Sequence, residues 1–251
     1  MKISIVGNGN VATVLARLAI QKGHTIKQII SRNIEARKLL AKEVDASYIF
    51  AKDQIDIGID LVIVAISDNA IPDGIADLQF EDVAVVHTAG AVSMFELAKN
   101  SSNYGVLYPL QSLRKEMQTI PPIPFLIEAN NENTLYIIET FARSLSDDVQ
   151  IEKEEKRLRM HAAAVIVSNF TNYLYGMAET FCKEENIDFN LLKPLIVETA
   201  TRIEHNSALD VQTGPAKRGD VSTLSKHLRL LDNHPKLRVL YTRMSDGIMN
   251  G

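Results

Sequence analysis

Four polar side chains that can transfer or position a proton recur along an apolar stretch in the second half of the chain. His161, Ser168 and Asn172 stand at positions i, i+7 and i+11, so that the last two lie within about 20° of His161 at 3.6 residues per turn, and Asn169 flanks this stripe. The sequence predicts one long helix from 160 to about 183, and its middle, 162–167, is apolar almost all round and is expected to be buried. Unpartnered polar groups are costly in a buried helix. Either the four groups bond to neighbouring helices or they line a wet cleft, and we favour the cleft. The catalytic candidates are then His161, Asn169 and Asn172, with Ser168 against a substrate, because the ordinary pKa of histidine suits proton transfer near neutral pH.

A second group of residues near the start of the chain can bind phosphate. The sequence Gly7-Asn8-Gly9-Asn10-Val11-Ala12 has the form G-x-G-x-x-A and stands between a β-branched strand, 2–6, and a helical pattern that runs to Gly23. In this pattern Gly7 permits a tight turn, Gly9 lets the backbone approach a pyrophosphate, and Ala12 lets helix and strand pack closely. The alternative is an ordinary strand-to-helix turn, but the complete strand–helix–strand context favours a dinucleotide. The expected cofactor contacts here are Gly7, Asn8, Gly9, Asn10 and Val11.

The next strand, 25–30, ends in Ser31-Arg32-Asn33, where an NAD-binding protein usually carries an acidic residue for the ribose hydroxyl. Arg32 can bind a phosphate with two hydrogen bonds and Ser31 can donate a third, which favours the 2′-phosphate of NADP(H). The alternative is a solvated arginine at the end of a strand.

Two further strands end in small side chains. Residues 60–68 and 83–90 are apolar runs that are typical of parallel strands covered on both faces. Small residues after such strands leave room for a nicotinamide ribose, and the expected contacts are Ala65, Ile66, Ser67, Thr88, Ala89 and Gly90. We expect His87, a lone histidine at a strand end, to be a structural residue rather than a catalytic one.

Two loops carry further candidates. Four prolines make 110–123 a fixed loop, and its position after a strand at 104–108 makes Gln111 and Ser112 candidates for a substrate pocket. The stretch 212–220, QTGPAKRGD, has turn formers at Gly214 and Pro215 and a candidate helix cap at Asp220. A plain connector would explain those residues but not Gln212, Thr213 and Arg218.

Composition and length frame these candidates. The chain has 251 residues, 46% hydrophobic and 23% charged, which predicts a globular protein of two domains, 1–152 and 153–251. We expect an α/β class: a Rossmann doubly wound, mostly parallel sheet, followed by an all-helical substrate and dimerisation domain. The net charge of −4 argues against nucleic-acid or membrane partners, and the lone Cys182 predicts neither a disulfide nor a metal site. No signal-peptide core is apparent, so we expect a cytoplasmic location, which excludes an adhesion role for Arg218-Gly219-Asp220.

The motifs together resemble one bacterial family. They are GNGNVA at 7–12, SRN at 31–33, HTAG at 87–90, YPLQS at 108–112, HAAAV with NFTN at 161–172, and QTGPAKRGD at 212–220. This family joins a Rossmann-like NADP-binding domain to a C-terminal helical domain of unknown function. The resemblance implies a relationship to pyrroline-5-carboxylate reductase and to the 6-phosphogluconate dehydrogenase-like superfamily, in which the helical domain closes over the nicotinamide and commonly forms a dimer. It also implies that the 212–220 loop approaches the cleft, where Thr213 and Arg218 would meet a substrate.

One departure from the superfamily bears on activity. Its β-hydroxyacid dehydrogenases carry a lysine four residues before an asparagine on the central helix, but here Val165 precedes Asn169 and Ser168 precedes Asn172. We therefore expect an NADP(H)-dependent oxidoreductase of a small carbonyl or imine substrate, with a carboxylate for Arg218 and His161 as the acid. The alternatives are a non-catalytic NADP(H)-binding sensor or scaffold and a deazaflavin-linked reductase.

Overall fold

The computed structural model describes residues 1–49, 56 and 58–251. The chain divides into two compact units, Met1–Ser168 and Asn169–Gly251. The first contains the sheet and its helices, and the second is helical, as the fold class predicted. The last strand ends at Ile151 and the next helix begins at Glu154, so the predicted boundary at 152/153 lies at the change of secondary structure. The boundary between the two compact units lies farther along the chain, at 168/169. We keep 152/153 as a proposal for the limit between the two domains.

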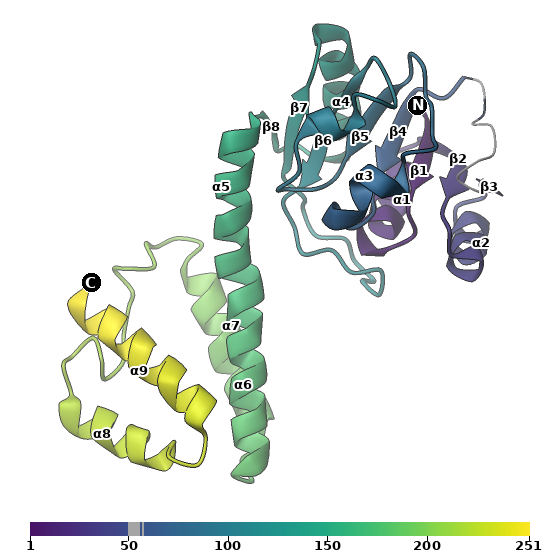
Figure 1. Ribbon diagram of the computed structural model, residues 1–251. Helices are drawn as coiled ribbons and strands as arrows, with labels where there is room; N and C mark the ends of the chain where they lie inside the picture. The colour runs from purple at the N-terminus through teal and green to yellow at the C-terminus, as the bar shows by residue number, and fades with distance from the viewer. Residues whose placement is uncertain (50–55, 57) are drawn as a thin grey trace. The chain divides into compact units, whose positions relative to one another are not determined.

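The described residues of the first unit form one sheet of eight strands in the order β3-β2-β1-β4-β5-β6-β7-β8 (Figure 1). Only the β6/β7 pair is antiparallel among the described strands. The order of the first six is that of the dinucleotide-binding Rossmann fold. The strands are β1 (Lys2–Val6), β2 (Thr25–Ile30), β3 (Ser47–Ile49), β4 (Leu61–Val64), β5 (Ala84–His87), β6 (Tyr104–Pro109), β7 (Phe125–Ala129) and β8 (Val149–Ile151).

Helices cover both faces of this sheet. They are α1 (Asn10–Gln21), α2 (Ile34–Glu43), α3 (Ile71–Gly74), α4 (Glu132–Leu145) and α5 (Glu154–Ala164), with short 3₁₀ turns η1 (Asp68–Ala70) and η2 (Met94–Leu97). Asparagines fix two of the helix starts: Asn33 accepts a hydrogen bond from the Ala36 N–H, and Asn131 accepts one from the Thr134 N–H.

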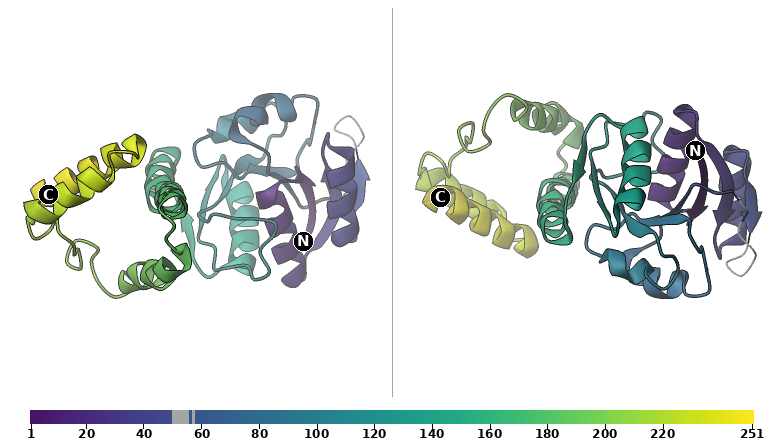
Figure 2. Two further views of the ribbon diagram at one scale, coloured as in Figure 1. Left: turned by 90° about the horizontal axis from the view of Figure 1, so that it is seen from below. Right: turned by 90° about the horizontal axis from the view of Figure 1, so that it is seen from above.

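Strand β4 explains why both faces are covered. Its four side chains are fully buried and alternate, so that Leu61 and Ile63 join one hydrophobic cluster while Val62 and Val64 join another. The first cluster lies under α1 and α4, which run side by side on one face (Figure 2). The second lies under α3 and η2. A strand buried on both sides cannot alternate polar and apolar residues, as its sequence indicated.

The helices of the second unit follow a π-helical stretch, η3 (Val165–Phe170), that connects α5 to α6 (Thr171–Glu184). The 3₁₀ turn η4 (Phe189–Leu192) and helices α7 (Lys193–Arg202), α8 (Val221–Leu230) and α9 (Pro235–Asn250) complete it. The predicted single α-helix across 160–183 is therefore wrong in its middle. Because a π-turn bonds residue i to i+5, a spacing of 3.6 residues per turn does not hold across residues 165–170.

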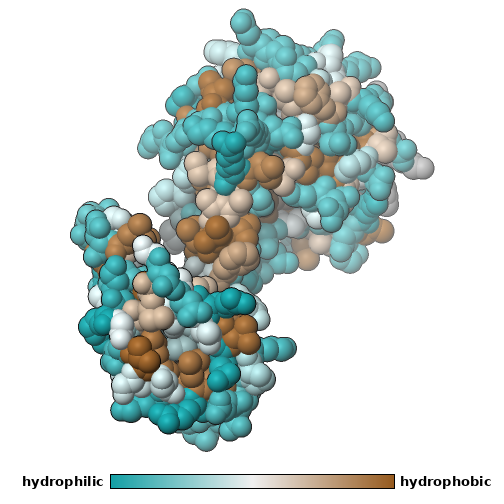
Figure 3. Space-filling model, turned by 60° about the vertical axis from the view of Figure 1, so that its left-hand side comes forward, coloured by the Kyte–Doolittle hydropathy of each residue, from teal (hydrophilic) through white to brown (hydrophobic). Residues whose placement is uncertain are grey.

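Apolar side chains remain exposed on the helical elements. Ile166 and Val167 are 58% and 72% exposed, so the prediction that 162–167 is buried is wrong for the single chain. Figure 3 shows apolar patches, coloured brown, on the helical unit among hydrophilic side chains. None of the described helices is long and apolar enough to span a membrane.

Candidate functional site at the carboxyl edge of the sheet

The carboxyl ends of β1, β4, β5 and β6 meet at one edge of the sheet. These four strands are parallel to one another, and β1 lies between β2 and β4, so the order of strands reverses on either side of β1. Ligands of open α/β sheets bind in the crevice outside such a reversal. The predicted cofactor residues of the first unit all follow these strand ends or that of β2.

Gly7 makes the turn after β1. Its φ is +122°, and a Cβ at this position would collide with the Ala65 carbonyl oxygen. The Gly7 N–H donates to the Ile30 oxygen at 2.8 Å, and the Ala65 N–H donates to the Val6 oxygen at 2.8 Å, which holds the ends of three neighbouring strands together. Glycine is therefore required at this position by both conformation and space.

The turn then opens into α1. Gly9 is the N-cap residue, it makes no side-chain cap, and a Cβ there would meet nothing within 4 Å. The first N–H groups of α1 thus have no side-chain cap and can donate hydrogen bonds to an anion. Asn8 Nδ2 donates to the Asn33 oxygen at 3.4 Å, and Asn10 Oδ1 accepts from the Lys115 N–H at 3.2 Å. These two contacts join the glycine turn to the loops on either side of it.

The loop after β2 presents the predicted phosphate contacts. Arg32 is exposed and its Nη2 donates to the Asp73 oxygen at 3.0 Å, while Ser31 is half-buried and its Oγ accepts from the Asn33 N–H at 3.3 Å. Arg37, which the sequence did not single out, lies buried below, and its Nη1 donates to the Ser31 and Ile49 oxygens at 2.8 Å each. Arg37 therefore fixes the backbone that carries Ser31 and Arg32.

The ends of β4 and β5 lie beside the glycine turn. Ala65 is buried, Ile66 half-buried and Ser67 exposed at the start of η1. After β5, the Thr88 N–H donates to the Val64 oxygen at 3.1 Å, which joins this end to that of β4. The buried residues Thr88, Ala89 and Gly90 then form the floor of the edge.

His161 lies at this edge. A Cβ added to Gly90 would stand 2.6 Å from its Nδ1 atom, and the Tyr108 hydroxyl lies 2.9 Å from the same nitrogen. The Tyr108 and His161 rings meet edge to face, with centroids 5.7 Å apart. The residues Gly90, Tyr108 and His161 thus form a cluster at the ends of β5 and β6, and we call it the edge cluster. The sequence identified two of its members but not Tyr108 as a contact of His161.

Helix α5 owes its position in this unit to a buried arginine. Arg157 is fully buried, forms an ion pair with Glu128 on β7, and donates from Nη2 to the Val92 oxygen at 2.7 Å. Met160, one turn before the end of α5, packs against the small cluster around Val106 and Tyr108. Arg157 stands four residues before His161, so both lie on neighbouring turns of one helix face, and the pairing of Arg157 with Glu128 sets where His161 stands. Because Arg157 stands in a run of charged residues, the sequence gave no sign of this role.

His87 is structural, as expected. It is fully buried, its Nδ1 accepts from the Ala89 N–H at 3.2 Å, and its buried Nε2 has no hydrogen-bond partner in the described structure. Burial, followed by the nearby Arg157 guanidinium, lowers the pKa of His87 to about 4. A histidine that stays neutral and enclosed at neutral pH supports the strand end rather than proton transfer.

Gln111 lies in the proline-rich loop, where its own amide is occupied. Its Nε2 donates to the Pro122 oxygen at 3.3 Å, and its Oε1 accepts from the Ser112 N–H at 2.9 Å. The side chain is exposed, and its role in a substrate pocket stays a prediction.

The remaining candidates lie on or after the π-helical stretch. Ser168 is half-buried, and Asn169 and Asn172 are exposed. The phase argument that aligned them with His161 assumed an uninterrupted α-helix, so it no longer carries their assignment. Thr213 and Arg218 are exposed in the second unit. The roles of these five residues stay predictions.

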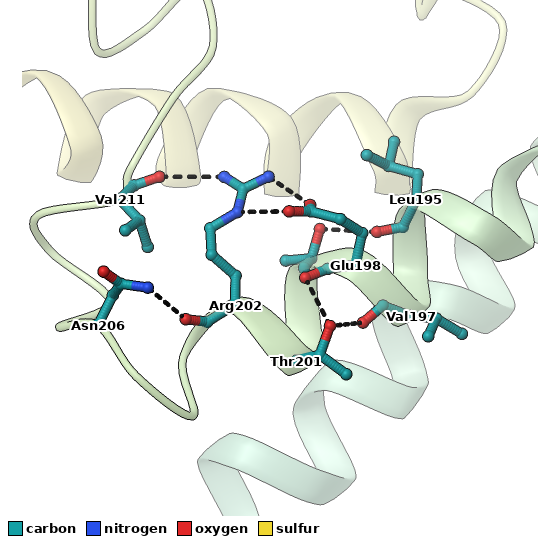
Figure 4. Close-up of polar contacts among 8 residues, drawn as sticks. Leu195, Val197, Glu198, Thr201, Arg202, Asn206 and Val211 are labelled. Carbon is teal, nitrogen blue, oxygen red and sulfur yellow. Dashed lines mark hydrogen bonds and ion pairs between the residues drawn. The ribbon is translucent and has the colours of Figure 1, made fainter.

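The 212–220 loop has the turn chemistry that the sequence indicated. Gly214 and Gly219 have φ of +106° and +64°, and Asp220 caps α8 by accepting from the Thr223 N–H at 3.0 Å. The segment before it is held by Arg202 (Figure 4), whose Nη1 donates to the Val211 oxygen at 3.3 Å and whose Nε donates to Glu198 at 2.8 Å. The loop that carries Thr213 and Arg218 thus has a defined backbone at both ends.

The fold and the edge define a Rossmann-type protein with a nucleotide-binding sheet edge and a helical C-terminal region. The chain belongs to the family described as domain of unknown function (DUF2520), whose model matches residues 123–248. Residues 2–90 match the family described as NADP oxidoreductase, coenzyme F420-dependent. The predicted family resemblance is therefore confirmed.

Solved structures agree with this assignment. A protein of Bacteroides fragilis described as a "putative NADP oxidoreductase" is 35% identical, with a TM-score of 0.92 over 100% of this chain and 98% of that one. A protein of Thermotoga maritima is 24% identical, with a TM-score of 0.74 over 98% and 96% of the two chains. The 1-pyrroline-5-carboxylate reductase of Streptococcus pyogenes shares the fold at 16% identity, with a TM-score of 0.64 over 100% and 99%. No curated protein sequence matches the chain significantly.

Proposed function

We propose that the protein is an NADPH-dependent reductase of a small carbonyl or imine substrate that carries a carboxylate. The observation that carries the proposal is the position of His161, which touches Gly90 at the same sheet edge as the glycine turn. A proton-bearing ring beside a nucleotide-binding edge is the arrangement that a reductase needs.

The residues of this edge fit a dinucleotide. The uncapped start of α1 suits a pyrophosphate, and open space faces Gly9, where a side chain would otherwise obstruct the backbone. Ser31 and Arg32 would hold the 2′-phosphate, and residues 65–67 and 88–90 would enclose the nicotinamide ribose. When bound, NADPH supplies the hydride, and His161 supplies the proton to the substrate oxygen or nitrogen.

The helical region would complete the site. We propose that Asn169 and Asn172 orient the substrate with His161, and that Gln111, Ser168, Thr213 and Arg218 bind it, with Arg218 on the carboxylate. We also propose a homodimer, with no nucleic-acid partner and a cytoplasmic location. Within the described residues, no group of three or more His, Cys, Asp or Glu side chains could hold a metal ion.

Cofactor choice tests the first half of the proposal. We expect NADPH to bind more tightly than NADH in a fluorescence titration, and Arg32→Ala to lose most of that preference, because the guanidinium is the charged partner of the 2′-phosphate. Lys38→Ala, which removes an exposed cation from the neighbouring helix, is the matched control and should keep the preference. Equal affinity for the two cofactors in the wild type would refute the assignment of Ser31 and Arg32.

Turnover measurements test the second half of the proposal, the reduction of a substrate. We expect NADPH oxidation with one or more members of a panel of oxo-acids and cyclic imines, and His161→Ala should reduce kcat by about 100-fold or more while cofactor affinity stays nearly unchanged. Two alternatives predict other results. A sensor, which the absence of the superfamily lysine favours, would bind NADPH tightly with no turnover. A deazaflavin-linked reductase, which the description of the matched 2–90 family favours, would transfer hydride only when a deazaflavin replaces the panel substrates.

A further inference from the structure

Tyr108 lies at the carboxyl end of β6, which is parallel to β5, so its side chain starts from the same sheet edge as Gly90. It is only 8% exposed, and its hydroxyl lies 2.9 Å from Nδ1 of His161. Gly90 packs against the same imidazole: a Cβ there would stand 2.6 Å from Nδ1 and 3.0 Å from Cε2 of Tyr108. The His161 ring is thus bonded to a hydroxyl and packed on a backbone position that leaves no room for a side chain.

This arrangement treats the two ring nitrogens differently. Nδ1 is bound by Tyr108, whereas Nε2 has no hydrogen-bond partner among the residues that the structure describes. His161 is half-buried, so the second nitrogen is not enclosed as that of His87 is. A hydrogen bond at one nitrogen of a histidine commonly decides which chemistry the other nitrogen performs.

We propose that Tyr108 is a positioning residue for proton transfer: its hydroxyl holds Nδ1 of His161 and leaves Nε2 as the atom that delivers the proton. The inference rests on the proposed reductase and deepens it, because it names the donor atom and the group that orients it.

The proton balance follows from the geometry. In the imidazolium form both nitrogens carry a proton, so Nδ1–H must donate to the Tyr108 oxygen while Nε2–H donates to the substrate oxygen or nitrogen. When the Nε2–H bond breaks, its electron pair stays on the nitrogen, and the proton forms the new O–H or N–H bond as the adjacent carbon receives hydride. His161 is left neutral with its proton on Nδ1, still bonded to Tyr108, and one proton from water restores it.

Tyr108 itself does not compete as the donor. Burial, followed by the nearby Asp68 carboxylate, raises the pKa of the Tyr108 hydroxyl, so the phenol keeps its proton at neutral pH. Its lone pairs therefore remain available to Nδ1–H throughout the transfer.

Removing the hydroxyl tests this role by kinetics. We expect Tyr108→Phe to lower kcat by roughly tenfold, the effect of about one hydrogen bond, with the KM for NADPH unchanged. Because Tyr108 acts through His161, the double variant Tyr108→Phe/His161→Ala should be no slower than His161→Ala alone. Tyr104→Phe is the matched control, since Tyr104 lies on the same strand at its opposite end and packs on Phe95. Additive losses in the double variant would overturn the proposal.

Nuclear magnetic resonance of the nitrogen-15-labelled protein tests it without turnover. A ring proton on Nδ1 that is held by Tyr108 should exchange slowly with water, so we expect its resonance at mildly acidic pH in the wild type and in Tyr104→Phe. It should be absent in Tyr108→Phe and in His161→Ala. Persistence of the resonance in Tyr108→Phe, or a normal kcat for that variant, would overturn the role of Tyr108 alone. A wild type that shows the resonance but reduces no substrate would instead overturn the proposed reductase.

Discussion

His87 and His161 both lie near the carboxyl end of β5, but their surroundings differ. His87 is fully buried, with Nδ1 bonded to the Ala89 N–H and Nε2 enclosed without a partner in the described structure. His161 is half-buried, with its Nδ1 bonded to the Tyr108 hydroxyl. Burial and the neighbouring Arg157 lower the pKa of His87 to about 4, so its charged form is disfavoured in the folded state. His87 therefore binds a proton less readily in the folded chain than in the unfolded chain.

This difference predicts acid sensitivity. Between pH 6.5 and pH 4 the unfolded state binds a proton at His87 that the folded state does not, so the free energy of unfolding falls as the pH falls through this window. The pKa shift corresponds to a loss of at most about 3 kcal/mol. We expect His87→Asn, whose amide oxygen can still accept from the Ala89 N–H, to lose less stability than the wild type when urea unfolding at pH 7 and pH 4.5 is compared.

His205 provides the control, because it is an exposed histidine of the helical unit. His205→Asn should keep the full acid sensitivity of the wild type. Equal losses of stability in His87→Asn and the wild type would show that the buried imidazole is not the group responsible.

For single residues, the sequence predicted the glycine turn better than it predicted contacts between residues that are far apart in the chain. The G-x-G-x-x-A pattern identified Gly7 because only a tight turn between strand and helix explains it, and the positive φ of Gly7 agrees. The bond between Tyr108 and His161 joins residues that are 53 positions apart, and it depends on how Arg157 and Glu128 anchor α5 to β7. Neither residue carries a local signal for that contact, so sequence alone could not predict it.

Helices and strands also differed in how well the sequence predicted them. Strand β2 (Thr25–Ile30) begins and ends where the sequence predicted, because Gly23 precedes it and Ser31-Arg32-Asn33 follows it. Strands β3 and β8 were missed, since each has three residues and lies at an edge of the sheet, too short for a periodic pattern. The π-turn at Val165–Phe170 was missed because no glycine or proline within it marks a change in the helix.

The cap of α8 is an element whose contribution can be measured. Asp220 accepts from the Thr223 N–H at 3.0 Å and from the Thr223 hydroxyl at 2.7 Å, and these bonds, followed by Arg218 and Lys226, lower the pKa of its carboxyl. We expect Asp220→Ala to lower the midpoint of thermal unfolding, measured by circular dichroism, because the first turn of α8 loses its acceptor. Asp220→Asn should retain most of the wild-type midpoint, because its amide oxygen still accepts from the Thr223 N–H.

The pH dependence of this cap has the opposite cause to that of His87. Because folding lowers the pKa of Asp220, its contribution is present above the ordinary carboxyl pKa and is lost as the pH falls through the lowered value. If Asp220→Asn were as unstable as Asp220→Ala at neutral pH, charge rather than hydrogen bonding would hold the start of α8.

For the whole molecule, the two units differ most in how they bury apolar side chains. All three hydrophobic clusters among the described residues draw their buried members from the first unit. In the second unit the buried apolar residues are only Cys182, Ala216, Leu224 and Leu231, although every residue of that unit is described. A helical unit of this size normally buries a continuous core, so its exposed apolar surface requires a partner.

A second copy of the chain is the partner that we expect. The exposed large apolar side chains of residues 169–251 include Phe170, Tyr173, Leu191, Leu195, Val197, Leu209, Val221, Leu230 and Val239. Analytical ultracentrifugation should therefore give a mass of about twice the 27.9 kDa of one chain. Leu191 in η4 and Leu195 in α7 are 74% and 59% exposed. Leu191→Glu/Leu195→Glu should therefore shift the protein toward the monomer by placing two carboxylates in the interface.

The control uses the same substitution at an equally exposed leucine of the other unit. Leu39 on α2 is 70% exposed, and Leu39→Glu should leave the mass unchanged, because the first unit already buries its own core. Since the helical unit lacks such a core, dissociation should also lower its stability, and the double variant should unfold at lower urea concentration when the protein is diluted. A wild-type chain that sediments as a monomer and unfolds independently of its concentration would contradict the dimer, and the exposed side chains of α7 would then need another partner.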